Sequence, residues 1–198
     1  KIVGVLTQAA RDSTVSVAIF SKILGLRSLN LKTTKLVLLK HKMGLKFNKD
    51  LNSKLYNYNE IDKIKNNFPY VVKFLGKSGG NGNFYINSRK DLDRIKKKIK
   101  KEKNIYIEDF VKGRHFSIAG IRNGKKTKFI CLIEKKINNN FSNDLIFYQP
   151  DLDNFKRKAY KYCKEVLNKI NFDYGPFHFE FIFFNNQFFL AEIEPSLI

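Results

Sequence analysis

Two glutamates near the C-terminal end of the chain could together bind a cation. Glu180 and Glu192 lie within a phenylalanine-rich stretch, residues 175–195, whose pattern predicts a strand, a turn and a second strand. If residues 185–187 form a three-residue turn, the register places Glu180 directly opposite Glu192. A two-residue turn would instead put the two carboxylates on opposite faces of the hairpin.

A three-residue turn also decides which side chains surround this pair. Strand alternation would place Glu194 on the same face as the other two glutamates. Facing like charges repel and desolvation adds to the cost, so the cluster favours a bound cation. Oxygen ligands favour Mg²⁺ or Mn²⁺, which usually share their coordination shell with substrate phosphates. An exposed hairpin edge with solvated glutamates is the alternative. The apolar residues expected on this face are Ile182, Phe184, Phe188 and Leu190.

A glycine-rich segment is suited to phosphate. Lys73 lies near the end of a strand expected over residues 69–75, and four glycines follow within residues 76–82. Glycine permits the positive φ values that aim successive N–H groups at an anion, and lysine supplies a point charge. The spacing is not that of a P-loop, because no Gly-Lys-Ser/Thr closes it before a helix. An ordinary hairpin turn rich in Gly and Asn is the alternative.

The composition indicates a folded protein with reduced thiols. The chain has 198 residues, of which 43% are hydrophobic and 19 are phenylalanine, enough for one domain or two small ones. No run is long enough to cross a membrane, and residues 1–6 are too short for a signal-peptide core. Cys131 and Cys163 lie in apolar surroundings, which favours a cytoplasmic protein. The sequence reads as a segment of something longer.

The formal charge of +20 is typical of proteins that bind nucleic acid through its phosphates. Lys, Asn and Ile are all over-used, however, as in a base-biased genome. The densest lysine run, residues 96–101, falls in one helix whose apolar positions are Leu92, Ile95 and Ile99, so it forms a solvated helix face. No RNA-binding signature is visible. A basic nucleic-acid-binding module is therefore the lesser alternative, and nucleic acid is not expected as a partner.

The periodicities predict an α+β protein without internal repeats. Residues 1–6 are expected to end a buried strand. Helices are expected over residues 14–24, from an N-cap at Thr33 or Thr34 to Gly44, after a cap at Ser88, and over residues 155–170. Further strands are expected over residues 84–86, 104–111, 116–121 and 128–133, before the final hairpin.

Taken in order, these segments resemble the ATP-grasp superfamily, most closely the branch that holds biotin carboxylase and the amino-acid ligases. The matching motifs are Leu24-Gly25-Leu26, Lys35, Pro69-x-Val71-Val72-Lys73, Gly82, residues 107–113, His178-x-Glu180 and Glu192-Ile193-Glu194-Pro195. The resemblance spans nearly the whole chain. It implies two α+β subdomains whose antiparallel sheets clamp a nucleotide.

The resemblance also implies how the chain is divided. Residues 1–32 would end a preceding α/β domain. Residues 33–106 would form the N-terminal ATP-grasp subdomain with the glycine loop. Residues 107–198 would form the C-terminal subdomain with the metal-binding hairpin, here truncated.

Phosphate contacts follow from the matching lysines and glycines. The resemblance implies that Lys35 and Lys73 contact nucleotide phosphates. Gly79, Gly80 and Gly82 would lie over the β- and γ-phosphates as a lid.

Adenosine contacts follow from the segment that resembles the family's hinge. Glu108 would meet the adenine amino group or a nearby polar partner, and the backbone at Asp109 and Val111 would read the ring edge. His115 falls where relatives bond the ribose hydroxyls.

Metal binding would fall to Glu180 and Glu192, with ATP and Mg²⁺ (or Mn²⁺) as cofactors. Glu194 stands where relatives usually have Asn, which would make a third metal carboxylate, and Ser196 stands where many have Arg. The implied catalytic residues are Lys73, Glu180 and Glu192.

The implied activity is that of an ATP-dependent carboxylate–amine ligase that forms ADP and is of the amino-acid or peptide ligase type. Small-molecule carboxylate and amine substrates are the expected partners, with a homodimer left open. A biotin-carboxylase-like activation of bicarbonate and a degenerate domain that binds nucleotide without turnover are the alternatives.

Overall fold

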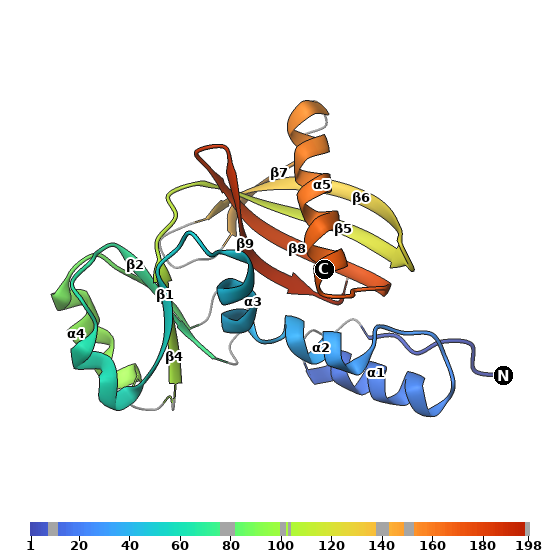
Figure 1. The fold of residues 1–198 in the computed structure, drawn as a ribbon, viewed down its shortest axis with the longest axis horizontal. Coiled ribbons are helices and arrows are strands. Elements are labelled where there is room, and N and C mark those ends of the chain that lie inside the picture. Colours follow the sequence, from blue (N-terminus) through green and yellow to red (C-terminus); the bar gives the residue numbers. More distant parts are fainter. Residues whose placement is uncertain are drawn as a thin grey trace.

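Two antiparallel sheets organise the chain (Figure 1). The computed structural model describes residues 1–7, 12–75, 82–99, 102, 104–137, 143–148 and 153–196. The smaller sheet has the order β1-β4-β2-β3, formed by Ser53–Asn57, Asn104–Asp109, Tyr70–Phe74 and Asn83–Ile86. The larger sheet has the order β7-β6-β5-β8-β9, formed by Asn143–Tyr148, Lys126–Ile137, Arg114–Asn123, Tyr174–Phe184 and Gln187–Glu194. This arrangement confirms the α+β prediction.

Two of these strands were not predicted from the sequence. β1 and β7 lie at the edges of the two sheets, each paired with a single neighbour. β1 has only intermediate and exposed residues. An edge strand of that kind carries little apolar alternation, which is the signal that sequence reasoning uses.

Helix α4 (Arg89–Ile99) covers the smaller sheet (Figure 1). The hydroxyl of Ser88 accepts a hydrogen bond from the Asp91 N–H at 3.3 Å and donates one to the Asp91 carboxylate at 2.8 Å, which confirms the predicted cap. Leu92 and Ile95 of α4 join the apolar cluster under the sheet. Lys97 and Lys98 are exposed, as predicted for a solvated helix face. A short 3₁₀ helix, Tyr58–Lys63, packs beside β1.

The long helix α5 (Asp153–Lys169) packs on one face of the larger sheet (Figure 1). Its helical spacing buries Ala159, Cys163, Val166 and Leu167. They meet alternate phenylalanines of β8, since strand alternation turns Phe177, Phe179 and Phe181 toward the helix. Burial raises the pKa of the Cys163 thiol, in agreement with an inert core cysteine.

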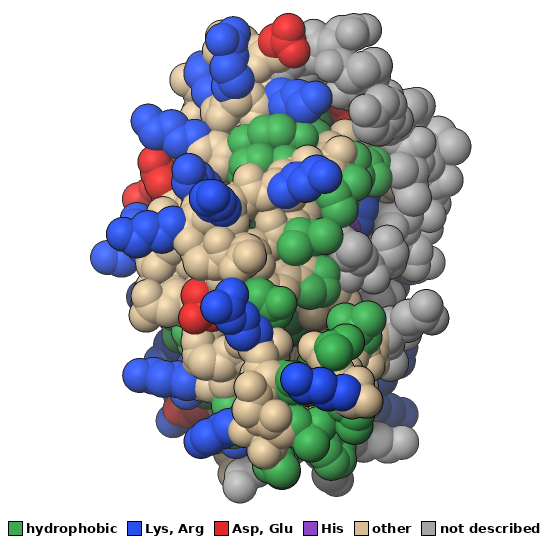
Figure 2. All heavy atoms as spheres, turned by 90° about the vertical axis from the view of Figure 1, so that its right-hand side faces the viewer, with side chains coloured by type: hydrophobic (Ala, Val, Ile, Leu, Met, Phe, Trp, Pro, Cys, Tyr) green, Lys and Arg blue, Asp and Glu red, His purple; other side chains and the backbone are tan. Residues whose placement is uncertain are grey.

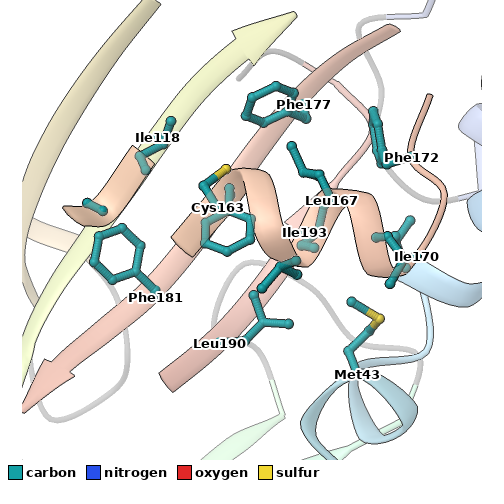
Figure 3. Close-up of a cluster of buried hydrophobic side chains, with 14 of the residues drawn as sticks. Met43, Ile118, Cys163, Leu167, Ile170, Phe172, Phe177, Phe181, Leu190 and Ile193 are labelled. Atoms are coloured by element: carbon teal, nitrogen blue, oxygen red, sulfur yellow. The ribbon is translucent and has the colours of Figure 1, made fainter. Parts of the chain in front are cut away.

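Two short helices, α2 (Leu31–Val37) and α3 (Lys40–Phe47), replace the single helix predicted from Thr33 or Thr34 to Gly44. Asn30, not a threonine, caps α2, because its side-chain oxygen accepts from the Thr33 N–H at 2.8 Å. The helix breaks at Leu39, which has φ −97° and ψ 76°. The break lets Val37 and Met43 enter the same core. Met43 is labelled in Figure 3.

The N-terminal segment does not form the predicted buried strand. Residues 1–7 have no regular structure, and Ile2, Val3 and Leu6 are exposed. A strand requires a neighbouring strand for its backbone hydrogen bonds, and none lies beside this segment in the described part of the chain.

Helix α1 (Asp12–Ile23) also turns apolar side chains outward. Figure 2 views the molecule from the side on which α1 lies and shows apolar side chains gathered there among lysines and arginines. The exposed apolar residues of α1 and its C-terminal turn are Ile19, Phe20, Ile23 and Leu24.

Helix α3 contacts both sheets, and Gly44 of this helix packs against Tyr106 of β4. A Cβ at this position would lie 2.3 Å from the Tyr106 hydroxyl, which is closer than atoms can pack. Gly44→Ala should therefore lower the free energy of unfolding by about 1–3 kcal/mol, measured by urea denaturation. Tyr106→Phe in the same chain should recover part of the loss. Gly4→Ala is the control, since nothing lies within 4 Å of its Cβ. A fully stable Gly44→Ala variant would contradict this packing.

Candidate active site

The β8–β9 hairpin turns in two residues, so the predicted three-residue turn is wrong. Asn185 and Asn186 have φ values of 47° and 60°, the left-handed conformation that asparagine tolerates and a tight hairpin turn requires. Phe184 accordingly pairs with Gln187 instead of Phe188.

A β-bulge restores the glutamate pair that the shorter turn would have separated. Phe181 pairs with Leu190 and Glu180 pairs with Glu192, so Ala191 is the extra residue on β9. The bulge supplies the residue that the turn lacks, and Glu180 faces Glu192 as predicted. The predicted places of Phe188 and Leu190 are wrong, because both residues pack into the core under α5, although Leu190 also borders the cavity.

A cavity of about 350 Å³ lies over this pair and is lined by both sheets and α3. The structure brings most of the residues identified in the sequence to its wall. Those are Lys73, Glu108, Asp109, Val111, His115, Glu180, Glu192 and Glu194. Residues so far apart in the chain meet because β2 and β4 pair side by side, as do β5, β8 and β9.

The four remaining predicted residues do not line the cavity or cannot be placed. Lys35 is exposed on α2 and is not among the lining residues. Gly82 has φ 83° and its carbonyl accepts from the Phe74 N–H at 2.8 Å, but it does not line the wall. Gly79 and Gly80 lie outside the described residues.

Two lysines that were not among the predicted site residues neutralise the facing glutamates. Lys135 of β6 contacts a Glu180 carboxylate oxygen at 2.5 Å, and Lys40 of α3 contacts Glu192 at 2.7 Å. Both lysine side chains are largely buried, at 10% and 17% exposure. The only sequence signal for Lys135 is its alternation on a strand. Lys40 had no sequence signal, because nothing distinguishes it from the other lysines and arginines, of which the chain holds 38 in all.

The charge of Glu180 is stabilised by its partner. Burial alone would raise the pKa of Glu180, but the Lys135 ammonium outweighs burial and holds that pKa below its ordinary value. Glu180 is therefore ionised at neutral pH in the absence of any metal.

A second ion pair joins β2 to β4 on the cavity wall. Lys73 contacts the carboxylate of Glu108, which is buried. The lysine ammonium also lies 6.0 Å from the centre of the Tyr106 ring. Glu108 therefore holds Lys73 in a defined position at the cavity wall.

The end of β4 and the two residues after it line the cavity. The Asp109 carboxylate accepts from the backbone and side-chain N–H groups of Asn52, at 2.9 and 2.8 Å. The Phe110 N–H donates to the Pro69 carbonyl at 3.2 Å. Among the described residues no acceptor is found for the N–H of Val111.

Two histidines on the cavity side of the larger sheet are neutral, the buried His178 and the half-buried His115. Burial lowers the pKa of His178 to about 4, with the charge of Lys135 adding to the effect and Glu180 opposing it. Its Nδ1 lies 3.6 Å from Glu180 and has no hydrogen-bond partner in the described structure. Burial also lowers the pKa of His115, again against the effect of Glu180.

Glu194, the third predicted metal carboxylate, lines the cavity opposite His178. In the described part of the chain, however, no three or more His, Cys, Asp or Glu side chains lie close enough to hold a metal ion together. The facing pair Glu180 and Glu192 is thus the oxygen-donor set that the structure offers to a cation.

The sequence pattern of the ATP-grasp domain matches residues 40–196. This chain belongs to the ATP-grasp family. Members of the family are ATP-dependent ligases. No curated protein matches the chain.

Solved ATP-grasp structures share the fold at low sequence identity. An L-amino acid ligase from Bacillus licheniformis is 19% identical to this chain, with a TM-score of 0.76. The match covers 92% of this chain and 46% of the ligase chain. N5-carboxyaminoimidazole synthetase from Staphylococcus aureus, complexed with ADP, is 19% identical, with a TM-score of 0.75, and the match covers 93% of this chain and 51% of the synthetase chain. D-alanine–D-alanine ligase from Bacillus anthracis, complexed with ATP, is 13% identical, with a TM-score of 0.68, and the match covers 91% of this chain and 62% of the ligase chain. The chain thus spans about half to two thirds of these proteins.

These matches confirm the predicted ATP-grasp fold with its two antiparallel sheets. Within the described residues no helix is long and apolar enough to cross a bilayer.

The buried neutral His178 predicts a pH dependence of stability. The folded pKa of about 4 lies below the ordinary value of 6.5, so the unfolded state binds more protons between these values. Stability should be full above pH 6.5 and should fall as the pH drops toward 4. Urea midpoints across this range should show a smaller decline for His178→Gln than for the original chain. An equal decline in both would contradict the buried neutral histidine.

Proposed function

We propose that this chain carries the nucleotide site of an ATP- and Mg²⁺-dependent ligase that joins a carboxylate to an amine with formation of ADP. The observation that carries the proposal is the pair Glu180 and Glu192, facing each other at the base of a cavity that also holds Lys73, Lys40 and Lys135. Facing carboxylates suit a hard cation, and the lysines around them suit the phosphates that such a cation accompanies.

The proposed reaction has two steps. A carboxylate oxygen of the first substrate attacks the γ-phosphorus of ATP, the bond to the bridging oxygen breaks, and ADP leaves. The amine then attacks the carbonyl carbon of the acyl phosphate, phosphate leaves with the bonding electrons, and the amine loses a proton. Neither step requires a protein nucleophile, so catalysis rests on positioning and on neutralising phosphate charge.

The nucleotide would lie between the two sheets. We place the adenine edge against the backbone at Asp109 and Val111, which line the cavity. His115 would face the ribose, and Lys73, oriented by Glu108, would contact the phosphates. Lys40 takes over the phosphate role expected of Lys35, which lies outside the cavity wall.

The donor set fits a magnesium ion. Glu180 and Glu192 supply oxygen ligands from adjacent strands, and Mg²⁺ is typically held by one or two carboxylates together with substrate phosphates. When bound, the ion would withdraw negative charge from the phosphate oxygens during transfer. Glu194 is two residues from Glu192 on the same strand and is the candidate for an additional oxygen ligand.

Two named relatives support the carboxylate–amine assignment. An L-amino acid ligase and D-alanine–D-alanine ligase are among the structures with this fold, and the second was solved with ATP. A biotin carboxylase from Campylobacter jejuni also shares the fold, with a TM-score of 0.73 at 14% identity, so bicarbonate is the alternative carboxylate.

Thermal unfolding with and without Mg-ATP tests the site. A ligand at a hundred times its Kd stabilises a protein by about 2.7 kcal/mol, so Mg-ATP should raise the Tm clearly. Glu192→Ala should abolish the magnesium-dependent part of the rise, whereas Glu165→Ala, on the exposed face of α5, should leave it intact. An unchanged response in Glu192→Ala would refute the metal assignment.

Product analysis on the longest available form of the protein then separates the alternatives. ADP release that depends on an amino-acid pair supports the ligase, and release that depends on bicarbonate supports the carboxylase type. Mg-ATP binding without ADP release indicates a degenerate domain. Salt-sensitive DNA binding with no response to Mg-ATP would support the nucleic-acid alternative.

A further inference from the structure

Each of the two facing glutamates already has a cationic partner supplied by the protein. Lys135 reaches Glu180 from β6, and Lys40 reaches Glu192 from α3. The two lysines come from elements on different sides of the hairpin (Figure 1), so each carboxylate is paired independently. Because the pairs are largely buried, they are screened by solvent far less than surface ion pairs.

We propose that Lys40 and Lys135 occupy the metal site in the absence of nucleotide and thereby make metal binding dependent on nucleotide binding. This inference rests on the proposed function. A divalent ion arriving alone must displace both ammonium groups, and the displaced groups are left without counterions beside a new positive charge. A divalent ion arriving with a triphosphate brings the negative oxygens that the displaced lysines can bind.

The other charged groups on the cavity wall have contacts of their own. Lys73 is paired with Glu108, and the Asp109 carboxylate is held by Asn52. Glu194 lies opposite His178 and also has an interaction of its own. In the described part of the wall, Lys40 and Lys135 are therefore the ammonium groups in contact with the proposed metal ligands.

Two consequences follow from this arrangement. The apparent affinity for a metal ion alone is low, and nucleotide and metal bind with positive coupling that is reciprocal. The lysines also change partner during binding, from carboxylate to phosphate, which gives them a positioning role in placing the nucleotide.

The test is a titration with Mn²⁺ alone, followed through the loss of the electron paramagnetic resonance signal of the free ion. The original chain should bind Mn²⁺ weakly. Lys135→Met and Lys40→Met should each bind Mn²⁺ alone at least about tenfold more tightly, since one carboxylate is released from its ammonium. Lys136→Met is the matched control, because Lys136 is the next residue on β6 and is exposed. Its Mn²⁺ affinity should not change.

A parallel measurement of Mg-ATP binding by thermal shift distinguishes this inference from the proposed function. Both methionine variants should bind Mg-ATP more weakly and Mn²⁺ alone more tightly. A variant that merely failed to fold would bind both more weakly. Equal or weaker Mn²⁺ binding by both variants would overturn the inference, although Mg-ATP binding by the original chain would still support the proposed function. No Mg-ATP binding by the original chain would overturn both.

Discussion

The structure depends on one electrostatic constraint, which is that two carboxylates face each other on adjacent strands and each must be neutralised. Facing like charges on a partly buried sheet are unfavourable unless a cation lies between or beside them. Lys40 and Lys135 supply that charge from α3 and β6. The position of α3 between the two sheets and the place of β6 beside β5 both meet this requirement, because each element brings a lysine to the cavity.

The bulge at Ala191 shows how local geometry serves this constraint. With a two-residue turn and regular pairing, Glu192 would point into the core beside Phe179. One extra residue on β9 returns Glu192 to the cavity face while Phe188 and Leu190 remain under α5. Such bulges often occur next to active sites, where they re-aim a single side chain.

The sequence predicted the parts of the molecule that have strong local patterns. The α5 helix, the β8 and β9 strands and the Ser88 cap follow from apolar spacing and capping chemistry. Glu180 was predicted correctly to face Glu192, although the predicted turn was wrong. The turn is one residue shorter than predicted, and the bulge adds one residue to β9, so the register beyond the bulge is the same. The edge strand β1 and the Leu39 break have weak local signals. The ion pairs of Lys40 and Lys135 with the glutamates could not be predicted, because they form only when distant elements meet.

In the proposed mechanism, Glu180 and Glu192 bind the metal of a metal–nucleotide complex in place of their lysine partners. A crystal structure with Mn²⁺ and a non-hydrolysable ATP analogue tests it most directly through the anomalous signal of manganese. We expect one peak within ligand distance of both carboxylates, about 2 Å, with Lys40 and Lys135 turned to phosphate oxygens. A bound nucleotide whose metal lies elsewhere, with both lysines still on the glutamates, would contradict the account.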